Sequence, residues 1–332
     1  MPSYFTHRRT AHLWLRSVLV LSLACVLIAG LSVDEAIACD RPNTAIGLSR
    51  IVEIDTRTGP LFGKISRFEK QPTFLKPNEV ILTFDDGPSP KVTDAILRTL
   101  AEHCTLATFF PVGKRALRFP KTLRAVAAAG HTIGAHTWSH PNLSKLSEPK
   151  SRQEIERGFA AVALAADTGI APFFRFPGLA DTQPLLDYGK DRGVATFTVD
   201  VVSDDSYAKS TQAIIDTVFS RIKEYGAGIM LFHDLRMRTA KALPTVLKML
   251  KEKGFKVVHI RPKAPITPDP AFRSMLQPAL AAGLKRQSNV RVSVPLPAAI
   301  ARAPVETWSP KTPPEAPGPT ARSQDGSPNS AQ

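Results

Sequence analysis

Short apolar runs alternate with amphipathic segments along the middle of this chain, between about residue 77 and residue 261. The apolar runs are four to six residues long and are bounded by turn-forming residues, which is typical of buried strands. The segments between them repeat apolar positions at the helical period, and four of them stop just before a glycine, as helices often do. The pattern predicts strands at 80–84, 107–112, 132–135, 173–176, 195–199, 228–232 and 256–260, and helices at 92–103, 115–129, 152–166, 182–192, 211–225 and 241–253.

Strands that alternate with helices predict a parallel sheet covered by helices, which either closes as a barrel or stays open and doubly wound. Polar residues at the ends of the strands favour the barrel. Side chains so far apart in sequence converge most easily at one rim of a barrel, where the active sites of such folds lie. We therefore predict an α/β fold, an incomplete β/α barrel of about seven parallel strands, with these residues at one rim: Asp85, Asp86, His136, Arg175, Asp200 and His233.

The first 38 residues have the pattern of an export signal. Arg8, Arg9 and Arg16 precede an apolar run at 17–33, and small residues at 36–38 offer a cleavage site. The run is marginally short for a membrane span, which favours a cleaved signal over a retained anchor. The expected location is therefore the periplasm, the membrane surface or the medium.

The chain beyond the signal divides into three parts by composition. Residues 39–76 are a lead-in segment and residues 77–262 form the folded domain. Residues 263–332 are rich in proline, alanine and serine, and we predict disorder because such a segment buries too little apolar surface to offset its chain entropy. A short helix at 271–285 is the one candidate element there, although Pro278 would break or kink it.

The net charge and the number of cysteines limit which binding partners and which disulfides we expect. The formal net charge of +14 favours attraction to an anionic cell wall or membrane surface, partly through the basic tail. Nucleic acid is not an expected partner, because the chain is predicted to be exported and has no binding motif for it. Cys25 lies in the signal, so the mature chain holds at most one disulfide, between Cys39 and Cys104. Nothing in the sequence indicates an oligomeric state.

Two segments carry the chemistry. The first strand ends in TFDDGP at 83–88, where adjacent carboxylates repel each other and need a counter-charge such as a metal or an arginine. The segment HTWSHP at 136–141 supplies two imidazoles from a loop, since a strand precedes it and Pro141 disfavours helical geometry at His140. Two carboxylates and two imidazoles are enough for a catalytic site of the zinc type.

The division of labour between the two carboxylates follows from strand geometry. Thr137 stands where a zinc protease of the HExxH type has its glutamate, so the general base must come from elsewhere, and Asp85 or Asp86 is the obvious candidate. Adjacent strand residues point to opposite faces, so one carboxylate can bind metal while the other holds a proton. This adjacency argues against a glycosidase, whose carboxylates flank the scissile bond. His233 at the end of its strand is a candidate acid or base, and Arg175 needs an acidic partner, for which Asp85 is the candidate.

The chain resembles the polysaccharide deacetylases with the NodB homology domain, carbohydrate esterase family 4. The resemblance covers about 77–262 and rests on four segments in the family's order: TFDDGP at 83–88, HTWSHP at 136–141, RFPG at 175–178 and LFHD at 231–234. It implies a hydrolase that uses one divalent metal, usually zinc, with cobalt, manganese or nickel as alternatives. It also implies that Asp86, His136 and His140 hold this metal.

The resemblance assigns the remaining site residues as well. Asp85 is implied as the general base on the attacking water, with Arg175 orienting it. His233 is implied as the general acid that protonates the departing amine. Leu231 and Pro177 are implied as substrate-binding residues, with Leu231 at the methyl of the acetyl group.

One motif departs from the family. The family's aspartate–tryptophan pair, in which the aspartate holds the catalytic histidine, is replaced here by VDVVSDDSY at 199–207, which has no tryptophan. Asp204 is the best candidate for this tether, with Asp205 and Asp200 as alternatives. Tyr207 is the candidate to replace the tryptophan as a wall of the substrate pocket.

The expected function is an exported hydrolase that removes N-acetyl groups from N-acetylglucosamine-containing polysaccharide, with peptidoglycan first and chitin-like oligosaccharide second. One alternative is an O-deacetylase of an acetylated polysaccharide such as xylan. A second alternative is a carbohydrate-binding pseudoenzyme without catalytic activity.

Overall fold

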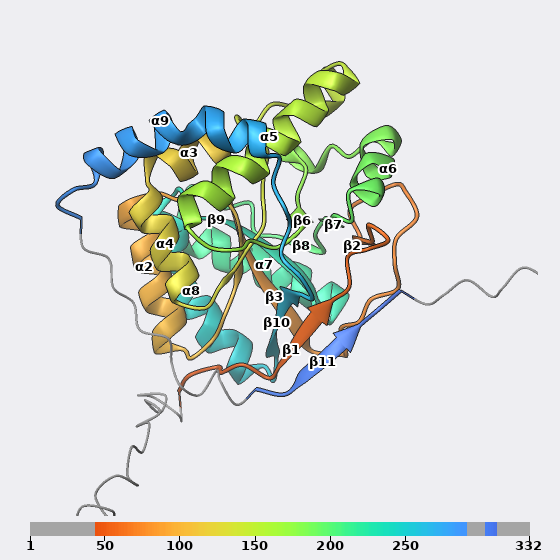
Figure 1. Ribbon diagram of the computed structural model, residues 1–332. Coiled ribbons are helices and arrows are strands. Elements are labelled where there is room, and N and C mark those ends of the chain that lie inside the picture. The colour runs from red at the N-terminus through yellow and green to blue at the C-terminus, as the bar shows by residue number, and fades with distance from the viewer. Residues whose placement is uncertain (1–43, 291–302, 311–332) are drawn as a thin grey trace, which may run out of the picture. The chain divides into compact units, whose positions relative to one another are not determined.

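In the described part of the chain, parallel strands form a central sheet against which helices pack, while β1 and β11 lie at an edge without a covering helix (Figure 1). The computed structural model describes residues 44–290 and 303–310. All pairings between named strands in these residues are parallel, and the strands form a curved sheet that does not close. The predicted α/β fold, an incomplete barrel, is therefore confirmed.

The central strand is β3 (Glu79–Asp85), which is buried at every position. It pairs with β9 (Gly228–His233) from Val80 to Asp85. On its other edge, β3 pairs near its start with β10 (Lys256–Pro262) and near its end with β4 (Thr108–Phe110). This register places Asp85 beside His233, so the polar ends of β3 and β9 meet at the same rim.

The remaining strands extend the sheet on either side. A parallel bridge between Ala135 and Phe174 links the part of the sheet that ends in β5 to the part that begins with β6. Beyond β4 the order is β5 (Thr132–Ile133), β6 (Phe173–Phe174), β7 (Ala195–Phe197) and β2 (Leu61–Phe62). Beyond β9 lies β8 (Val201–Val202). Beyond β10 lie β1 (Arg50–Ile54) and then β11 (Val305–Trp308).

The helices cover the outside of the sheet, and two apolar clusters fill the structure. The larger cluster lies between helices and strands, and the smaller one lies inside the curved sheet, where Phe62, Phe110 and Phe173 all contact the ring of Phe197. Strands with apolar contacts on both faces read as continuous apolar runs. The described helices are α2 (Pro90–Glu102), α3 (Gly113–Arg118), α4 (Pro120–Ala128), α5 (Glu148–Ala166), α6 (Gln183–Asp191), α7 (Thr211–Tyr225), α8 (Met237–Glu252) and α9 (Pro270–Arg286), with short 3-10 turns η1 (Leu143–Lys145) and η2 (Pro177–Leu179).

None of the helices among the described residues is long and apolar enough to cross a membrane. The predicted export signal at 1–38 lies outside the described residues. Cys104 is disulfide-bonded, and its partner also lies outside them.

The sheet begins before the predicted domain does. The lead-in segment at 39–76 contains β1 and β2, and β1 pairs along its length with β10. The pattern of β1 is hard to recognise because Arg50 is charged yet only 4% exposed. Its guanidinium is paired with the Glu79 carboxylate at 2.6 Å, which compensates for burial of the charge.

The prediction of a disordered tail is wrong for residues 270–286, which form α9. The helix continues past Pro278 because its apolar face packs against α3 and α5, with Leu276 and Leu280 buried. Gly283 permits the closest approach, since a Cβ there would lie 1.9 Å from the Leu117 carbonyl oxygen. Tertiary packing thus outweighs the local cost of proline.

The end of α9 is fixed by a buried glutamine. Gln287 accepts a hydrogen bond from the Lys121 backbone amide at 2.8 Å and donates one to Thr122 Oγ1 at 3.1 Å. These bonds tie α9 to the first turn of α4.

The predicted disorder is also wrong for residues 305–308, which form β11 at the edge of the sheet. Glu306 pairs with Arg50 at 3.0 Å, and the Trp308 ring packs edge-on against Phe62 with centroids 4.8 Å apart. The other parts of the predicted disordered tail, at 291–302 and 311–332, lie outside the described residues.

Candidate active site

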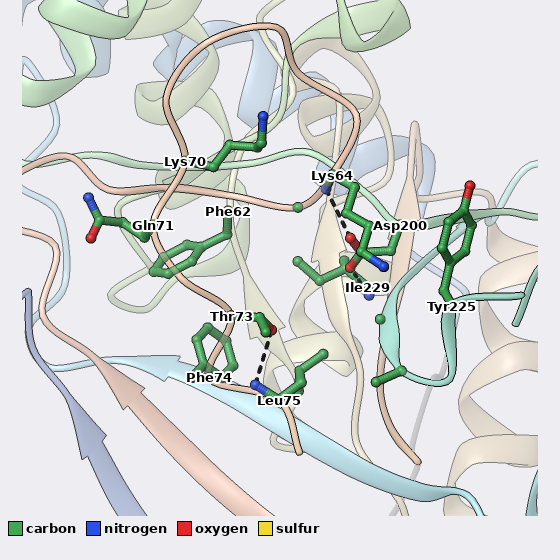
Figure 2. A pocket seen from close by; sticks show the side chains of 13 residues that line it. Phe62, Lys64, Lys70, Gln71, Thr73, Phe74, Leu75, Asp200, Tyr225 and Ile229 are labelled. Atoms are coloured by element: carbon green, nitrogen blue, oxygen red, sulfur yellow. Dashed lines mark hydrogen bonds between the residues drawn. The ribbon is translucent and has the colours of Figure 1, made fainter. Parts of the chain in front are cut away.

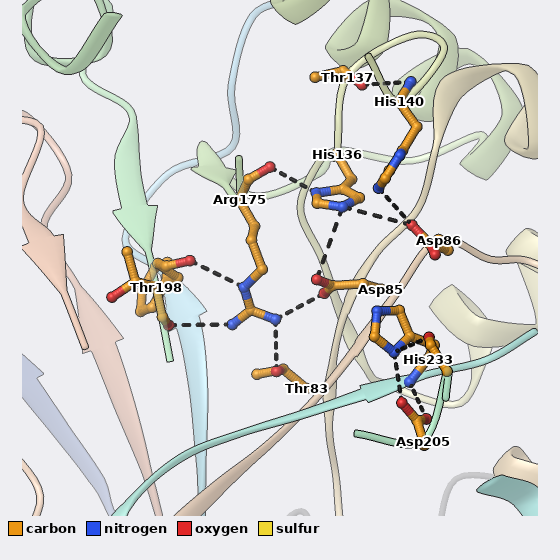
Figure 3. A network of polar contacts seen from close by, with 12 residues as sticks. Thr83, Asp85, Asp86, His136, Thr137, His140, Arg175, Thr198, Asp205 and His233 are labelled. Atoms are coloured by element: carbon orange, nitrogen blue, oxygen red, sulfur yellow. Dashed lines mark hydrogen bonds and ion pairs between the residues drawn. The ribbon is translucent and has the colours of Figure 1, made fainter. Parts of the chain in front are cut away.

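The loop after β3 separates the two adjacent carboxylates. Asp86 has a positive φ of 75°, and its backbone amide donates to the Phe110 carbonyl at 3.1 Å. Figure 3 shows the result: Asp85 faces Arg175, whereas Asp86 faces the two imidazoles. A non-glycine residue with positive φ is strained, and such strain concentrates at functional sites.

The two imidazoles approach the same oxygen of Asp86. His136 Nε2 lies 3.6 Å and His140 Nε2 3.2 Å from Asp86 Oδ1. His136 Nδ1 donates to the Arg175 carbonyl oxygen at 2.7 Å, so its Nε2 presents a lone pair to the site. Thr137 and His140 both have positive φ, and the His140 amide donates to Thr137 Oγ1 at 2.9 Å, which fixes the loop.

These three residues fit a divalent cation. One ligand atom from each of Asp86, His136 and His140 lies within 4.8 Å of the others. Asp86 Oδ1 is buried yet has no hydrogen-bond partner, as expected for an oxygen that serves a metal. Burial lowers the pKa of His136 to about 3, which keeps the imidazole neutral and able to act as a ligand. One carboxylate and two imidazoles form a donor set that suits catalytic zinc.

Asp85 is buried and is held by a buried arginine. Arg175 Nη1 donates to Asp85 Oδ1 at 2.7 Å and to Thr83 Oγ1 at 2.7 Å, and its Nε donates to the Phe197 carbonyl at 3.0 Å. The predicted pairing of Arg175 with Asp85 is present. The second carboxylate oxygen faces the site, 3.9 Å from His136 Nε2. Burial raises the pKa of Asp85, and the Arg175 charge opposes that rise.

His233 lies at the end of β9 with its ring held by Asp205. Its Nδ1 lies 2.7 Å from Asp205 Oδ1, and its backbone amide donates to Asp205 Oδ2 at 2.8 Å. Thr239 Oγ1 donates to the same Oδ2 at 2.7 Å. Burial lowers the pKa of His233, but the Asp205 hydrogen bond and charge, with the charges of Asp85 and Asp86, outweigh it and raise the pKa to about 9.

The preferred assignment of Asp204 as the tether is therefore wrong, and its alternative Asp205 is the residue in contact. Asp204 pairs instead with Arg221 Nη2 at 2.7 Å, and its side chain is 45% exposed. A positive φ of 53° at Asp204 turns the chain there, and the next residue, Asp205, is the one that is buried against His233. Sequence spacing alone does not reveal this turn.

Asp200, the other alternative, lies away from His233 and lines a separate cavity of about 290 Å³ (Figure 2). It accepts hydrogen bonds from the backbone amides of Lys64 at 2.9 Å and Ile229 at 2.7 Å. Ile229 is near the start of β9, whereas His233 ends that strand. Asp200 thus joins the segment after β2 to the beginning of β9, so the prediction that it lies at the rim with Asp85 and His233 is wrong.

The predicted substrate-binding residues differ in position. Leu231 is buried and lies two residues before His233 on β9, so both side chains point to the same face. Pro177 is buried at the start of η2. Tyr207 is 89% exposed and does not wall the site in this conformation. Ser206, which sequence reasoning missed, places its Oγ 3.2 Å from His233 Nδ1 instead.

The site and fold agree with the comparisons to known proteins. A family model described as polysaccharide deacetylase matches residues 75–197. A chitooligosaccharide deacetylase of Sinorhizobium fredii is 30% identical over 189 residues, which cover 53% of this chain and 87% of that protein. The solved structure of a peptidoglycan deacetylase of Bdellovibrio bacteriovorus superposes with a TM-score of 0.61 at 31% identity, over 68% of this chain and 62% of that chain. The chain belongs to the polysaccharide deacetylase family.

Other relatives are longer than the matched region. The peptidoglycan-N-acetylglucosamine deacetylase PgdA of Listeria monocytogenes is 31% identical over 181 residues, which cover 54% of this chain and only 38% of that protein. The chain therefore spans well under half the length of this relative.

Proposed function

We propose that this protein is a metal-dependent hydrolase that removes N-acetyl groups from N-acetylglucosamine-containing polysaccharide, with peptidoglycan as the first candidate substrate and chitin-like oligosaccharide as the second. The observation that carries the proposal is the placement of Asp85 and His233 beside one three-residue metal site. Relatives named as peptidoglycan and chitooligosaccharide deacetylases support the substrate class.

The residues at the site supply what amide hydrolysis requires. A divalent cation held by Asp86, His136 and His140 would polarise the acetyl carbonyl and make a water molecule more acidic. Asp85 accepts a proton from the attacking water through Oδ2, because Arg175 already holds Oδ1. Arg175 also keeps the carboxylate oriented and opposes its protonation.

His233 serves the leaving group. Its Nδ1 donates to Asp205, and a pKa raised to about 9 keeps the ring protonated, so Nε2 also carries a proton, which is transferred to the departing amine. An amine is a poor leaving group unless it is protonated as the carbon–nitrogen bond breaks. The products are acetate and the free amine of glucosamine.

Release of acetate and appearance of free amines test this proposal together. The purified protein with zinc should yield both from N-acetylglucosamine oligomers or peptidoglycan, and the Asp85→Asn variant should yield neither above background. Acetate without free amines, from O-acetylated xylan, would support the O-deacetylase instead. Glycan binding without any acetate release would identify a pseudoenzyme.

We also propose that the protein works outside the cytoplasmic membrane. The signal-like start of the sequence and the formal net charge of +14 support this location. Cell fractionation should find the protein in the periplasm, membrane or medium. A main pool in the cytoplasm would contradict the proposal.

A further inference from the structure

Asp234, the neighbour of His233, is a buried carboxylate that the chemistry above does not use. It is 1% exposed, and Oδ2 accepts a hydrogen bond from Thr93 Oγ1 of α2 at 2.6 Å. Its Oδ1 has no hydrogen-bond partner. Burying a carboxylate is costly unless it is well paired, so its position calls for a physical reason.

The surroundings of Asp234 are the loop that carries Asp85 and Asp86. The Asp234 backbone amide donates to the Asp85 carbonyl at 3.2 Å. Its carboxylate lies against Gly87, where a Cβ would be 2.0 Å from Oδ2. Thr93 Oγ1, which donates to Asp234, also accepts from the Ser89 backbone amide at 2.8 Å. Asp234 and Thr93 therefore contact the loop at every second residue, namely Asp85, Gly87 and Ser89.

Arg115 of α3 holds the same loop from another side. Its Nη2 donates to the Pro88 carbonyl at 3.2 Å, and its buried Nε has no hydrogen-bond partner. The charges of Asp234 and Asp86 both stabilise this guanidinium, against the cost of its partial burial. Burial raises the pKa of Asp234 to about 7, and in its ionised form the carboxylate attracts a cation that is bonded to the loop.

We propose that Asp234 and Thr93 are positioning residues that hold the 85–89 loop so that the Asp86 carboxylate faces His136 and His140. This inference rests on the proposed function, because it takes Asp86 as a metal ligand. Asp86 is held in a strained conformation with positive φ, so the loop needs external contacts to stay in this shape. When the Asp234–Thr93 pair is broken, the loop relaxes and the carboxylate moves away from the imidazoles.

The test uses two threonines of the same helix. Thr93→Val removes the hydroxyl that links Asp234 to Ser89, and Thr93→Ser keeps it. Thr99→Val is the matched control, since Thr99 is also buried on α2 but its hydroxyl donates to the Ala95 carbonyl of its own helix. Asp234→Asn is a second variant that keeps the side-chain size and removes the charge that faces Arg115.

The zinc dissociation constant is measured for each variant by competition with a chelator, and kcat and KM by acetate release from an N-acetylglucosamine oligomer. We expect Thr93→Val and Asp234→Asn to weaken zinc binding and lower kcat by about 10–100-fold, with KM little changed. Thr93→Ser and Thr99→Val should stay close to the parent protein.

The inference is overturned if Thr93→Val and Asp234→Asn match Thr99→Val in both zinc affinity and kcat. Because zinc affinity is measured directly, the outcome does not depend on the substrate. A parent protein that binds zinc and releases no acetate would contradict the proposed function, and weaker zinc binding by Thr93→Val would still support the positioning role.

Discussion

At the scale of single residues, backbone conformation decides which side chains form the site. Asp86, Thr137 and His140 all have positive φ, at a cost of about 1–3 kcal/mol each. Strand alternation predicted that Asp85 and Asp86 point in different directions, but Asp86 lies beyond the end of β3, and its positive φ is what turns its carboxylate away from Asp85. The aspartate that holds His233 could not be predicted from the sequence, because the turn that buries Asp205 depends on the backbone conformation of Asp204.

Separate substitutions of the two carboxylates test their division of labour. Asp85→Asn should leave zinc bound and lower kcat by about a hundredfold or more, since only proton transfer is lost. Asp86→Asn should weaken zinc binding itself. Zinc titration and acetate release measure the two effects. Equal loss of zinc by both variants would contradict this assignment.

The Asp205–His233 pair predicts how the rate depends on pH. His233 must be protonated to act as the acid, so the rate should fall as the pH rises through its pKa. That pKa is about 9 without metal, and the charge of a bound dication lowers it. Asp205→Asn removes a charged hydrogen bond of about 1.5–3 kcal/mol, so it should move the alkaline limb of kcat to lower pH by about 1–2 units.

Asp204→Asn is the control for this shift. Asp204 pairs with Arg221 and does not contact His233, so the alkaline limb should stay in place. A shift with Asp204→Asn and none with Asp205→Asn would restore the assignment that the sequence suggested.

At the scale of elements, the longer apolar runs between residues 77 and 261 were predictable, whereas β1 and the two-residue strands β2 and β8 were missed. The predicted strand 80–84 lies within β3, whereas β1 was missed because Arg50 is buried through an ion pair. The helix predicted at 115–129 is two helices, since Phe119 has a non-helical backbone and Pro120 begins α4. The candidate helix at 271–285 was expected to break or kink at Pro278, yet α9 runs through this residue because its packing preserves it.

The anchoring of α9 by Gln287 predicts a measurable contribution to stability. Gln287→Ala leaves the Lys121 amide and Thr122 hydroxyl without this partner, at a cost of about 1–3 kcal/mol in the free energy of unfolding. Gln277→Ala is the matched control, because Gln277 is exposed on the same helix and should change stability by about 0.5 kcal/mol or less. Urea denaturation measures both, and equal effects would show that the buried bonds do not stabilise the protein.

At the scale of the whole molecule, the convergence of strand ends was the most informative sequence signal. Asp85 and His233 are paired residues at the ends of β3 and β9, and His136 approaches Asp86 from the loop after β5. The residue types at these ends were enough to predict one rim and one site, although Asp200, which was predicted at the same rim, lies at the start of β9. They could not predict how the chain outside 77–262 completes the sheet and covers the helices, because those contacts depend on long-range packing.

Zinc should stabilise the folded chain as a whole, because its three ligands come together only after folding. At a free zinc concentration about 100 times the dissociation constant, the gain is about 2.7 kcal/mol. The melting temperature should therefore rise with zinc and fall back with a chelator. The His136→Ala/His140→Ala double variant should show no such rise, and an undiminished rise would place the bound zinc elsewhere.

The pairing of β1 with β10 has a consequence for how the chain acquires its structure. Paired residues such as Glu53 and Arg261 are 208 positions apart, so β1 has no neighbour until nearly the whole domain has been made. At about 5–20 residues per second, synthesis alone imposes a delay of about 10–40 s. Contacts of such high sequence separation also slow folding. A nascent chain that ends before β10 therefore cannot complete its sheet, and the domain reaches its native structure only late in synthesis.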